Sequence, residues 1–428
     1  MLDLKLIRQE PERVRDYLGR KGGSPHLERI LELDRSHRSA LQEVEAKKAE
    51  RNQKGTQVPL LKKEGKDASA LLEEMKQLAE EIRALDARVK EAEEELEEKL
   101  RWLPNLPHES VPVGPDSSAN VEVRRWGQIP TPAFSVKPHY DIGEELGLLD
   151  FKRGAKISGA GFVAFTGWGA RLQRALIQFF LDYHREHHGF VEVSIPYVVR
   201  RESMFGTGQL PKMEEDMYRC NEDDLFLIPT AEVPITNLYR EDESLRQEEL
   251  PIYRMGYSPC FRREAGTYGK ETRGLVRVHQ FDKVELVKIV TPESSYDELE
   301  SLVKCAEAIL VALELPYRVL ALASGDLSFA AAKCYDLEAW AAAEGRWLEV
   351  SSCSNFEAFQ ARRMGLRFRN AEGKLVYAHT LNGSGLALPR IIVAILENYQ
   401  TERGTVTVPK VLRPYLGGLE EFTPSPVR

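Results

Sequence analysis

The chain has 428 residues, more than one ordinary hydrophobic core organises, so two or three domains are predicted. Its 59 basic and 67 acidic residues give a net charge of −8, so a polyanionic partner has to be met by a local basic patch. No run of about 18 uncharged apolar residues occurs, and no membrane span is expected. The five cysteines lack Cys-x-x-Cys spacing, which is typical of reduced thiols in a cytoplasmic protein.

Apolar residues between about 26 and 102 recur at alternating steps of three and four, which predicts two helices packed as a coiled coil. The predicted seam of the second helix consists of Leu71, Met75, Leu78, Ile82, Leu85, Val89, Ala92 and Leu96. The shorter seam of the first helix consists of Ile30, Leu33, Ala40, Leu41 and Val44. Because Gly55, Pro59 and Gly65 disfavour a continuous helix, the chain is expected to reverse there into an antiparallel hairpin, a projecting arm about 45 Å long.

The first helix of this arm and its tip carry an excess of cations. The candidates for contact with nucleic-acid phosphates on the first helix are Arg35, Arg38, Lys47, Lys48, Arg51 and Lys54. Acidic residues crowd the base of the second helix. A solvated coiled-coil surface explains the same pattern, and this segment alone leaves both interpretations open.

The composition changes after the arm and predicts the domain boundaries. Residues 1–105 form the expected N-terminal helical domain, and residues 106–120, rich in proline, glycine and serine, form the expected linker. In residues 121–428, helical and strand-like patterns alternate irregularly. This predicts an α+β domain with a mixed, mainly antiparallel sheet flanked by helices.

Two neighbouring segments of the second domain carry residue types that suit a nucleotide. In GLVRVHQFDKVELVKIV, alternation places Arg277, Phe281 and Glu285 on one strand face. Upstream, Arg262 and Glu264 are expected on one side of an antiparallel partner strand. Cations bind phosphate oxygens, a carboxylate binds an amino group and a ring stacks on a purine. An amphipathic strand with solvated charges explains the alternation equally well.

The segment LNGSGLALPRIIVAILENYQ predicts a helix that begins near Pro389, with Arg390 in its first turn. A cation and free backbone N–H groups favour an anion there, although a glycine turn entering a core helix is the simpler alternative. No GxxxxGK[ST] sequence occurs, which argues against an ATPase of the P-loop class.

Two short polar clusters complete the candidate site. In IPTAEVP, Thr230 and Glu232 share one strand face, and in WLEVSSCSN a carboxylate and a hydroxyl at Glu349 and Ser352 suit Mg²⁺. A spacing of three puts Glu349 and Ser352 on opposite faces of a regular strand, so joint binding requires a bulge or a strand end. The histidines of HREHH lack the register of HExxH, and no zinc is expected.

These motifs together resemble those of the class II aminoacyl-tRNA synthetases. FRREAGTYGKETRGLVRVHQFDKVE is similar to their motif 2, NGSGLALPRIIVAILENYQ to motif 3, and RALIQFFLDYHREHHGFVEVSIPYVV to motif 1 of the dimer interface. PTAEV, GTGQLP and EVSSCSNFEAFQARR are more particular to the seryl branch. The chain thus resembles the bacterial seryl-tRNA synthetase family over nearly its whole length.

The resemblance implies an enzyme that activates L-serine with ATP to seryl-adenylate and transfers serine to tRNA(Ser), with tRNA(Sec) left open as a second acceptor. It implies Mg²⁺ at Glu349 and Ser352, a homodimer, and catalytic roles for Arg262 and Arg390. It also implies ATP-binding roles for Arg262, Arg263, Glu264, Arg277, Val278, Phe281, Glu349, Val350, Ser351, Ser352 and Arg390. The serine-binding residues it implies are Thr230, Ala231, Glu232, Glu285, Asn382 and Ser384.

Two other hypotheses fit parts of the sequence. A relative of this family that loads an amino acid onto a carrier protein needs no arm, and the intact basic arm argues against it. A binding protein without catalysis can lose any of the polar site residues. The retained Arg262, Glu264, Glu349 and Arg390 argue against that second hypothesis.

Overall fold

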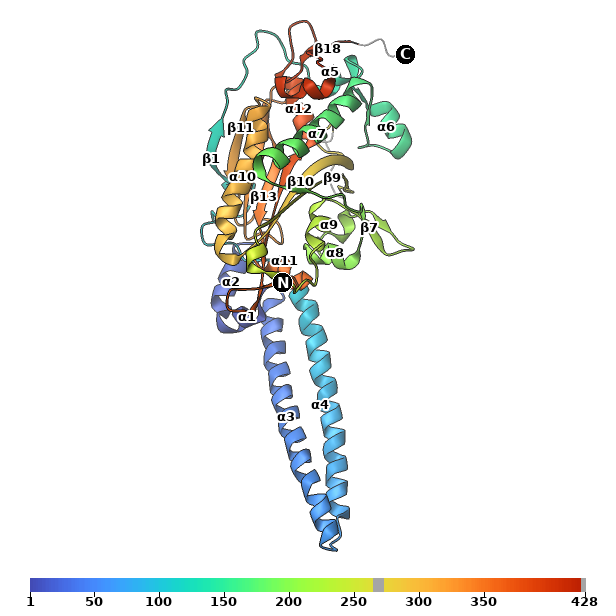
Figure 1. Cartoon of the computed structure of the whole chain (residues 1–428), viewed down its shortest axis with the longest axis vertical. Coiled ribbons are helices and arrows are strands. Elements are labelled where there is room, and N and C mark those ends of the chain that lie inside the picture. Colours follow the sequence, from blue (N-terminus) through green and yellow to red (C-terminus); the bar gives the residue numbers. More distant parts are fainter. Residues whose placement is uncertain (265–272, 425–428) are drawn as a thin grey trace. The chain divides into compact units, whose positions relative to one another are not determined.

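The computed structural model of the chain describes residues 1–264 and 273–424. The described chain divides into two compact units, Met1–Pro104 and Asn105–Arg428 (Figure 1). Residues 265–272, most of the loop expected between the two motif 2 strands, lie outside the described residues. Among the helices described here, none is long and apolar enough to cross a membrane.

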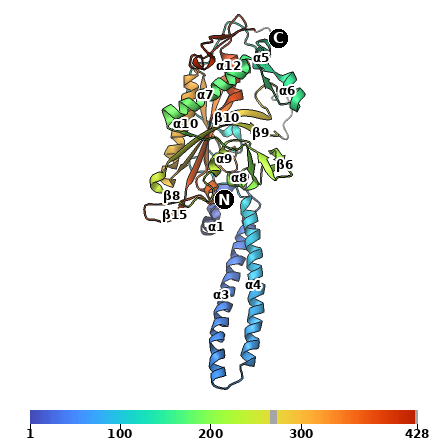
Figure 2. The ribbon, with the colours of Figure 1, turned by 45° about the vertical axis from the view of Figure 1, so that its right-hand side comes forward.

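The first unit consists of two short helices and a long helical hairpin. Its elements are α1 (Leu4–Gln9), α2 (Pro11–Gly19), α3 (Leu27–Lys63) and α4 (Ser69–Arg101). Helices α3 and α4 lie side by side in both views (Figures 1 and 2), as the apolar spacing predicts. The seam is buried at Ile30, Leu33, Ala40, Val44, Leu78, Ile82, Leu85 and Leu96.

Two details of the predicted hairpin are wrong. Leu41 is 37% exposed, because it follows Ala40 by one residue and therefore points about 100° away from the seam. Helix α3 also continues through Gly55 and Pro59, and of the three predicted breakers only Gly65, at φ 69°, lies in the turn. Proline removes one helical hydrogen bond, and the packing of α3 along α4 outweighs that loss.

The second unit is built on an eight-stranded sheet, which confirms the predicted fold class. The strand order is β1-β11-β12-β13-β16-β10-β9-β4, antiparallel throughout except where β4 pairs with β9. The bounds are β1 Val121–Trp126, β4 Val191–Glu192, β9 Ile252–Phe261, β10 Gln280–Val290, β11 Tyr317–Ala321, β12 Lys333–Ala341, β13 Arg346–Asn355 and β16 His379–Ala387. The expected linker, residues 106–120, is hydrogen-bonded to this unit, for example by the His108 amide to the Ala332 carbonyl.

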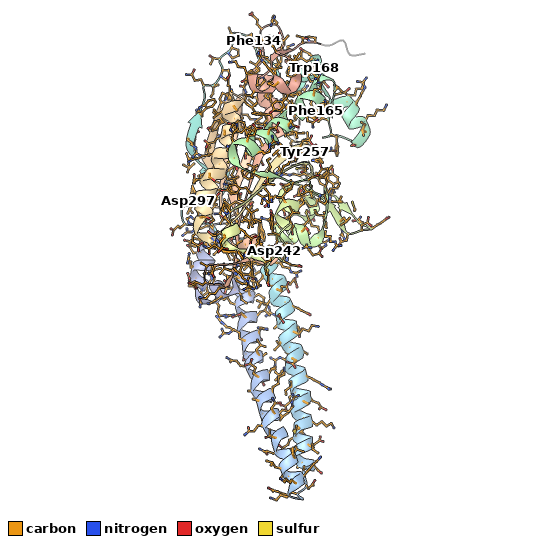
Figure 3. The ribbon with its side chains drawn as sticks, viewed as in Figure 1. Phe134, Phe165, Trp168, Asp242, Tyr257 and Asp297 are labelled. Atoms are coloured by element: carbon orange, nitrogen blue, oxygen red, sulfur yellow. The ribbon has the colours of Figure 1, made fainter. Side chains whose placement is uncertain are left out.

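Three helices share one hydrophobic core with this sheet: α7 (Trp168–His188), α10 (Ser295–Ala312) and α12 (Leu388–Asn398). Along β10, Val284 and Leu286 belong to that core, as their alternation predicts. Figure 3 marks Trp168 at the start of α7 and Tyr257 on β9. The helices thus cover the face of β10 that carries Val284 and Leu286, and Phe281 and Lys283 on the opposite face line the cavity described below.

Shorter elements surround the sheet. The helices are α5 His139–Glu145, α6 Phe151–Ser158, α8 Arg201–Gly206, α9 Glu232–Asn237 and α11 Phe359–Met364. Small sheets are formed by β2 Leu149–Asp150 and β3 Ala164–Phe165, by β5 Val198–Arg200, β6 Arg219–Cys220 and β7 Leu225–Leu227, by β8 Leu245–Arg246, β14 Arg367–Arg369 and β15 Leu375–Tyr377, and by β17 Val406–Thr407 and β18 Glu421–Phe422.

Candidate active site

A cavity of about 880 Å³ lies in the second unit, large enough for a nucleotide and a small ligand together. Phe281 and Lys283 of β10 face it, on the side opposite the core residues Val284 and Leu286. The predicted site residues that line it are Thr230, Glu232, Arg262, Glu264, Arg277, Val278, Phe281, Glu349, Val350, Ser352, Asn382, Ser384 and Arg390. Strands and a helix that are far apart in sequence therefore converge on one hollow.

One wall of the cavity comes from the ends of β9 and β10. The guanidinium of Arg262 lies 5.1 Å from the ring centre of Phe281, so a cation and an aromatic face are presented together. The Nε of Arg277 lies 3.1 Å from Oε2 of Glu264. This juxtaposition offers phosphate-binding cations beside a surface on which a purine can stack.

The predicted strand alternation fails at the start of this segment. Strand β10 begins at Gln280, so residues 276–279 are not part of it. The backbone of His279 is bonded instead to two crossing segments: its amide donates to the Gly161 carbonyl, and its carbonyl accepts the amide of Arg262. These long-range bonds turn Arg277 out of the strand and toward Glu264.

Arg390 lies in the first turn of α12, as predicted, and is held by two other segments. Its Nη1 donates to the backbone carbonyl of Glu349 at 2.7 Å and to Oε2 of Glu349 at 3.3 Å. Its Nε donates to the carbonyl of Val276 at 3.2 Å. The guanidinium is therefore fixed at the cavity wall, in the first turn of a helix, where the positive end of the helix dipole favours an anion.

The spacing problem of Glu349 and Ser352 is resolved by a β-bulge. Asp336 pairs with Ser352 and Glu338 with Glu349, so Val350 is an extra residue opposite β12. The bulge brings Glu349 and Ser352 to the same side, where both line the cavity together with Asp336 and Glu338. Carboxylate and hydroxyl oxygens are hard donors that fit Mg²⁺, whose remaining positions are usually filled by water and phosphate.

A buried charge cluster forms another part of the cavity. The ammonium of Lys283 is paired with the carboxylate of Glu285 and donates to the Thr230 hydroxyl at 2.7 Å. Asn382 donates to the other oxygen of Glu285 at 2.9 Å. Glu285 is fully buried, yet Thr230, Lys283 and Asn382 that hold it all line the cavity.

Glu232 lies close to this cluster and accepts a hydrogen bond from Gln360 at 2.7 Å. Burial, and then the neighbouring charge of Glu285, raise the pKa of Glu232 to about 7. The carboxyl of Glu232 therefore gains or loses its proton near pH 7. It lines the same cavity as Lys283, which is paired with Glu285.

Some site residues were missed by sequence reasoning. Lys283, Asp336 and Gln209 line the cavity, and Gln360 holds Glu232. For Lys283 the signal was present, because a lysine on the same strand face as Phe281 and Glu285 is costly to bury without a partner.

Other predicted residues do not reach the cavity. Arg263 points to the carbonyl of Glu215 at 2.9 Å, and Ala231 is fully buried before α9. Ser351 donates to the carbonyl of Ser384 at 2.7 Å and so supports the neighbouring strand.

The cations of the arm fall into two groups. Lys47, Lys48 and Lys54 form ion pairs across the hairpin, with Glu81 at 2.5 Å, Asp86 at 3.1 Å and Glu74 at 2.8 Å respectively. Arg38 lies 3.9 Å from Asp34 within α3. Arg35 and Arg51 make no ion pair with any residue in the described parts of the chain. Among the six candidates predicted for phosphate contact, these two arginines are therefore the most available.

Comparison with known proteins agrees with this architecture. A model of the seryl-tRNA synthetase N-terminal domain matches residues 1–107, and a model of the class II core domain of tRNA synthetases (G, H, P, S and T) matches residues 212–399. The serine–tRNA ligase of Caldicellulosiruptor saccharolyticus is 57% identical over 417 residues, which cover 97% of this chain and 99% of that protein. The chain belongs to the seryl-tRNA synthetase family. The family member of Carboxydothermus hydrogenoformans is 54% identical over 418 residues, with 97% and 98% coverage.

Solved structures of the family have the same fold. The crystal structure of seryl-tRNA synthetase from Pyrococcus horikoshii complexed with ATP superposes with a TM-score of 0.95 at 40% identity and covers 99% of this chain and 100% of that one. The cytoplasmic enzyme of Naegleria fowleri in complex with AMP superposes with a TM-score of 0.90 at 29% identity, covering 99% of each chain. Both units thus have family counterparts.

The adjacent arginines of the motif 2 wall provide a matched test of the site. Arg262→Ala is expected to lower serine-dependent ATP–pyrophosphate exchange by about 10²–10³-fold, because it removes a cation that faces the cavity. Arg263→Ala is expected to stay within about threefold of the unchanged protein, since its guanidinium bonds to the Glu215 carbonyl. Equal losses in the two variants would contradict the geometry.

The raised pKa of Glu232 predicts a pH-dependent stability. The unfolded carboxyl loses its proton near pH 4.5 and the folded one near pH 7, so ionisation favours unfolding increasingly from pH 4.5 to 7. Glu232→Gln removes this cost, on the order of 3 kcal/mol at pH 8. The gain in Tm over the unchanged protein is therefore expected to be larger at pH 8 than at pH 5. A gain that is independent of pH would rule out the shift.

Proposed function

We propose that the chain activates L-serine with ATP to seryl-adenylate, releasing pyrophosphate, and transfers serine to tRNA(Ser), releasing AMP. The observation that carries this proposal is the single cavity, in which the Arg262 and Phe281 wall meets the Lys283 and Glu285 cluster. One end suits a nucleotide, and the other suits a small zwitterion. The serine–tRNA ligases to which the chain is 51–57% identical support the same conclusion.

Activation requires the serine carboxylate to attack the α-phosphate in line with the leaving pyrophosphate. In this mechanism Arg262 holds the α-phosphate and stacks against Phe281, which stacks on the adenine ring. Arg277 and Arg390 bind the outer phosphates, and Glu264 accepts a bond from the adenine amino group. Positioning and charge stabilisation account for most of the rate, since little proton transfer is needed.

Glu349 and Ser352 are the residues that would hold Mg²⁺, because the bulge at Val350 places both donors on the cavity wall. The ion, when bound, neutralises developing charge on the phosphates. Arg390 bonds to Glu349, so the cation that binds phosphate and the carboxylate that binds metal keep a fixed separation.

Serine selection follows from the buried charge cluster. Glu285 and Glu232 receive the ammonium group, and Thr230, Asn382 and Ser384 surround the side chain. A ligand that lacks the hydroxyl, such as alanine, leaves buried polar groups without partners, which costs orders of magnitude in kcat/KM. We expect the enzyme to be a homodimer, to require Mg²⁺ for activity and to work in the cytoplasm.

Transfer to tRNA is assigned to the arm of the first unit. Arg35 and Arg51 contact phosphates, whereas Lys47, Lys48 and Lys54 hold the hairpin together through ion pairs with acidic residues of α4. In the dimer, the arm of one subunit reaches the tRNA whose acceptor end enters the partner's cavity. Whether tRNA(Sec) is also charged is tested by the same assay with that substrate.

Glu285→Ala tests the amino-acid half of the proposal. The change removes the carboxylate proposed to bind the ammonium and leaves Lys283 unpaired in a buried site. Serine-dependent ATP–pyrophosphate exchange is expected to fall below detection, while circular dichroism keeps its native helical signal. Exchange near the unchanged rate in a folded variant would refute the serine site.

A comparison of arm variants tests the transfer half. Replacing Arg35 and Arg51 together by alanine is expected to lower aminoacylation of tRNA(Ser) at least tenfold and to reduce the salt slope of tRNA binding by up to about two. Pyrophosphate exchange without tRNA is expected to be unchanged. The control replaces Lys47 and Lys48, which are ion-paired, and is expected to have the smaller effect. Equal rates of tRNA(Ser) aminoacylation in all variants would contradict the proposed role of the arm in binding tRNA.

A further inference from the structure

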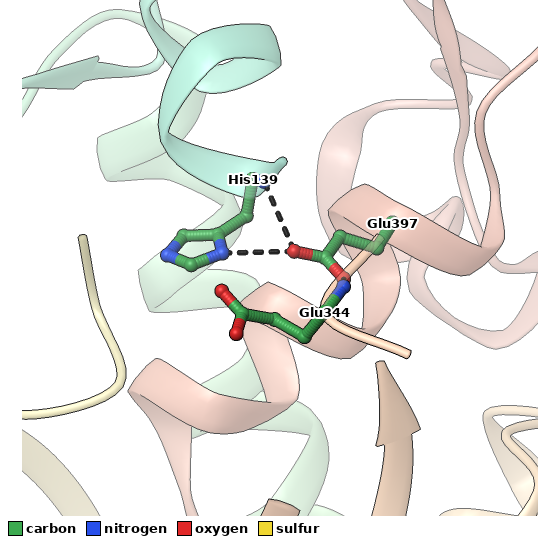
Figure 4. A group of neighbouring side chains, drawn as sticks. All are labelled: His139, Glu344 and Glu397. Carbon is green, nitrogen blue, oxygen red and sulfur yellow. Dashed lines mark hydrogen bonds and ion pairs between the residues drawn. The ribbon is translucent and has the colours of Figure 1, made fainter. Parts of the chain in front are cut away.

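A fully buried histidine lies outside the cavity and bonds on both sides of its ring. His139 begins α5, and its Nδ1 lies 2.9 Å from Oε1 of Glu397 in the last turn of α12 (Figure 4). Both side chains are 0% exposed. None of the residues assigned to ATP, serine or metal is part of this pair, although Arg390 lies in the first turn of the same helix.

The other ring nitrogen of His139 holds the segment that leads to Arg277. Its Nε2 accepts the amide of Leu275 at 3.0 Å. The preceding Gly274 has φ +81°, and a Cβ there would lie 2.1 Å from Nε2, so the backbone passes directly against the ring. Only glycine tolerates both the conformation and the approach.

Helix α12 therefore holds this segment at two points. Through His139, its last turn fixes Leu275, and through Arg390, its first turn bonds to the carbonyl of Val276. Arg277 is the next residue, and its side chain lines the cavity. The backbone that leads into Arg277 is therefore fixed by two hydrogen bonds, one at Leu275 and one at Val276.

The hydrogen bonds define the state of the histidine. Because Nε2 accepts a backbone N–H, the neutral ring carries its proton on Nδ1 and donates it to Glu397. The carboxylate of Glu397 also accepts the amides of His139 at 3.1 Å, Ala343 at 2.9 Å and Glu344 at 3.2 Å.

His139, Glu344 and Glu397 are near enough to suggest a metal site. Both ring nitrogens are already committed to protein partners, however, and the Glu397 oxygens are shared among backbone and ring donors. The cluster is satisfied by hydrogen bonds alone, so an ion would have to break them.

We propose that His139 is a positioning residue for ATP: it transmits the fixed position of Glu397 to Leu275 and thereby sets Arg277 against the nucleotide phosphates. The inference rests on the proposed role of Arg277 in ATP binding. It predicts that loss of the ring acceptor weakens ATP recognition more than serine recognition, because the side-chain partners around Glu285 are Thr230, Lys283 and Asn382, and His139 is not among them in the described part of the chain.

The test measures KM for ATP and for serine in pyrophosphate exchange with the full-length enzyme. His139→Phe keeps a ring but removes both bonds, and it is expected to raise KM for ATP about tenfold or more with KM for serine within twofold. His139→Gln retains an acceptor near the position of Nε2 and is expected to restore KM for ATP to within about threefold. Equal rises in both KM values, or no rescue by glutamine, would overturn the proposal.

A double-mutant cycle separates positioning from a general loss of structure. In an Arg277→Ala background, His139→Phe is expected to add less than twofold to KM for ATP, because the group it positions is already absent. Multiplicative effects would overturn the proposal. Where His139→Phe folds poorly, His139→Leu, which also removes both ring bonds, takes its place in the cycle. If Arg277→Ala alone leaves KM for ATP unchanged, the assignment of Arg277 fails, and the inference fails with it.

Glu344→Gln is the matched control for the metal alternative. Its carboxylate would be a ligand in a metal site but has no part in the proposed positioning, so both KM values are expected to remain within twofold. Zinc binding is measured by isothermal titration calorimetry with zinc alone. If the unchanged enzyme binds one equivalent of zinc and Glu344→Gln binds none, the cluster is a metal site and the positioning proposal is overturned.

Discussion

The register of β10 between β9 and β16 is the constraint on which the rest of the site depends. It sets Glu285 opposite Ser384 on one side and opposite Gly256 on the other, and Phe281 opposite Cys260 at the end of β9. A shift by one residue would turn Lys283 and Glu285 into the core and expose Val284 and Leu286 to the cavity. The apolar face under the helices therefore specifies the polar face that carries the chemistry.

The charged residues of that polar face are stable in a buried site only because they are present together. A buried lysine or glutamate alone is costly, but Lys283 and Glu285 neutralise each other, and Thr230 and Asn382 supply further bonds. Glu232 completes the set with a carboxyl whose pKa is raised toward neutrality. An incoming ammonium group would be received by carboxylates already oriented by protein partners, which reduces the cost of ordering them on binding.

Sequence reasoning succeeded where the controlling interactions are local or periodic. The seam of the arm, the antiparallel strands and the placement of Arg390 in the first turn of a helix all follow from spacing of three, four or two residues. It was incomplete or wrong where distant partners decide the outcome. The sequence indicated that Glu349 and Ser352 need a bulge or a strand end, but the choice of a bulge at Val350 depends on how β12 pairs with β13. Residues 276–279, which were expected in the strand, leave it because His279 bonds to Gly161 and Arg262.

The arm shows the same difference between what local sequence predicts and what distant partners decide. Pro59 would end an isolated helix, and local propensity predicts as much, but packing against α4 carries α3 on to Lys63. Likewise, the basic row on α3 is visible in the sequence, whereas the pairing of Lys47 with Glu81 joins residues 34 apart. Charge composition identified a candidate surface, and only the pairing distinguishes free cations from those that hold the hairpin.

Helix α12 shows how one short element can organise a site of many segments. Its first turn bonds through Arg390 to strand β13 and to Val276, and its last turn bonds through Glu397 to α5 and the turn after β12. Because α12 is also buried in the central core, any displacement of it would disturb packing and several bonds together. The cavity-wall groups that bond to α12 are therefore held as rigidly as the core, and the proposed binding of phosphates by Arg277 and Arg390 requires such fixed placement.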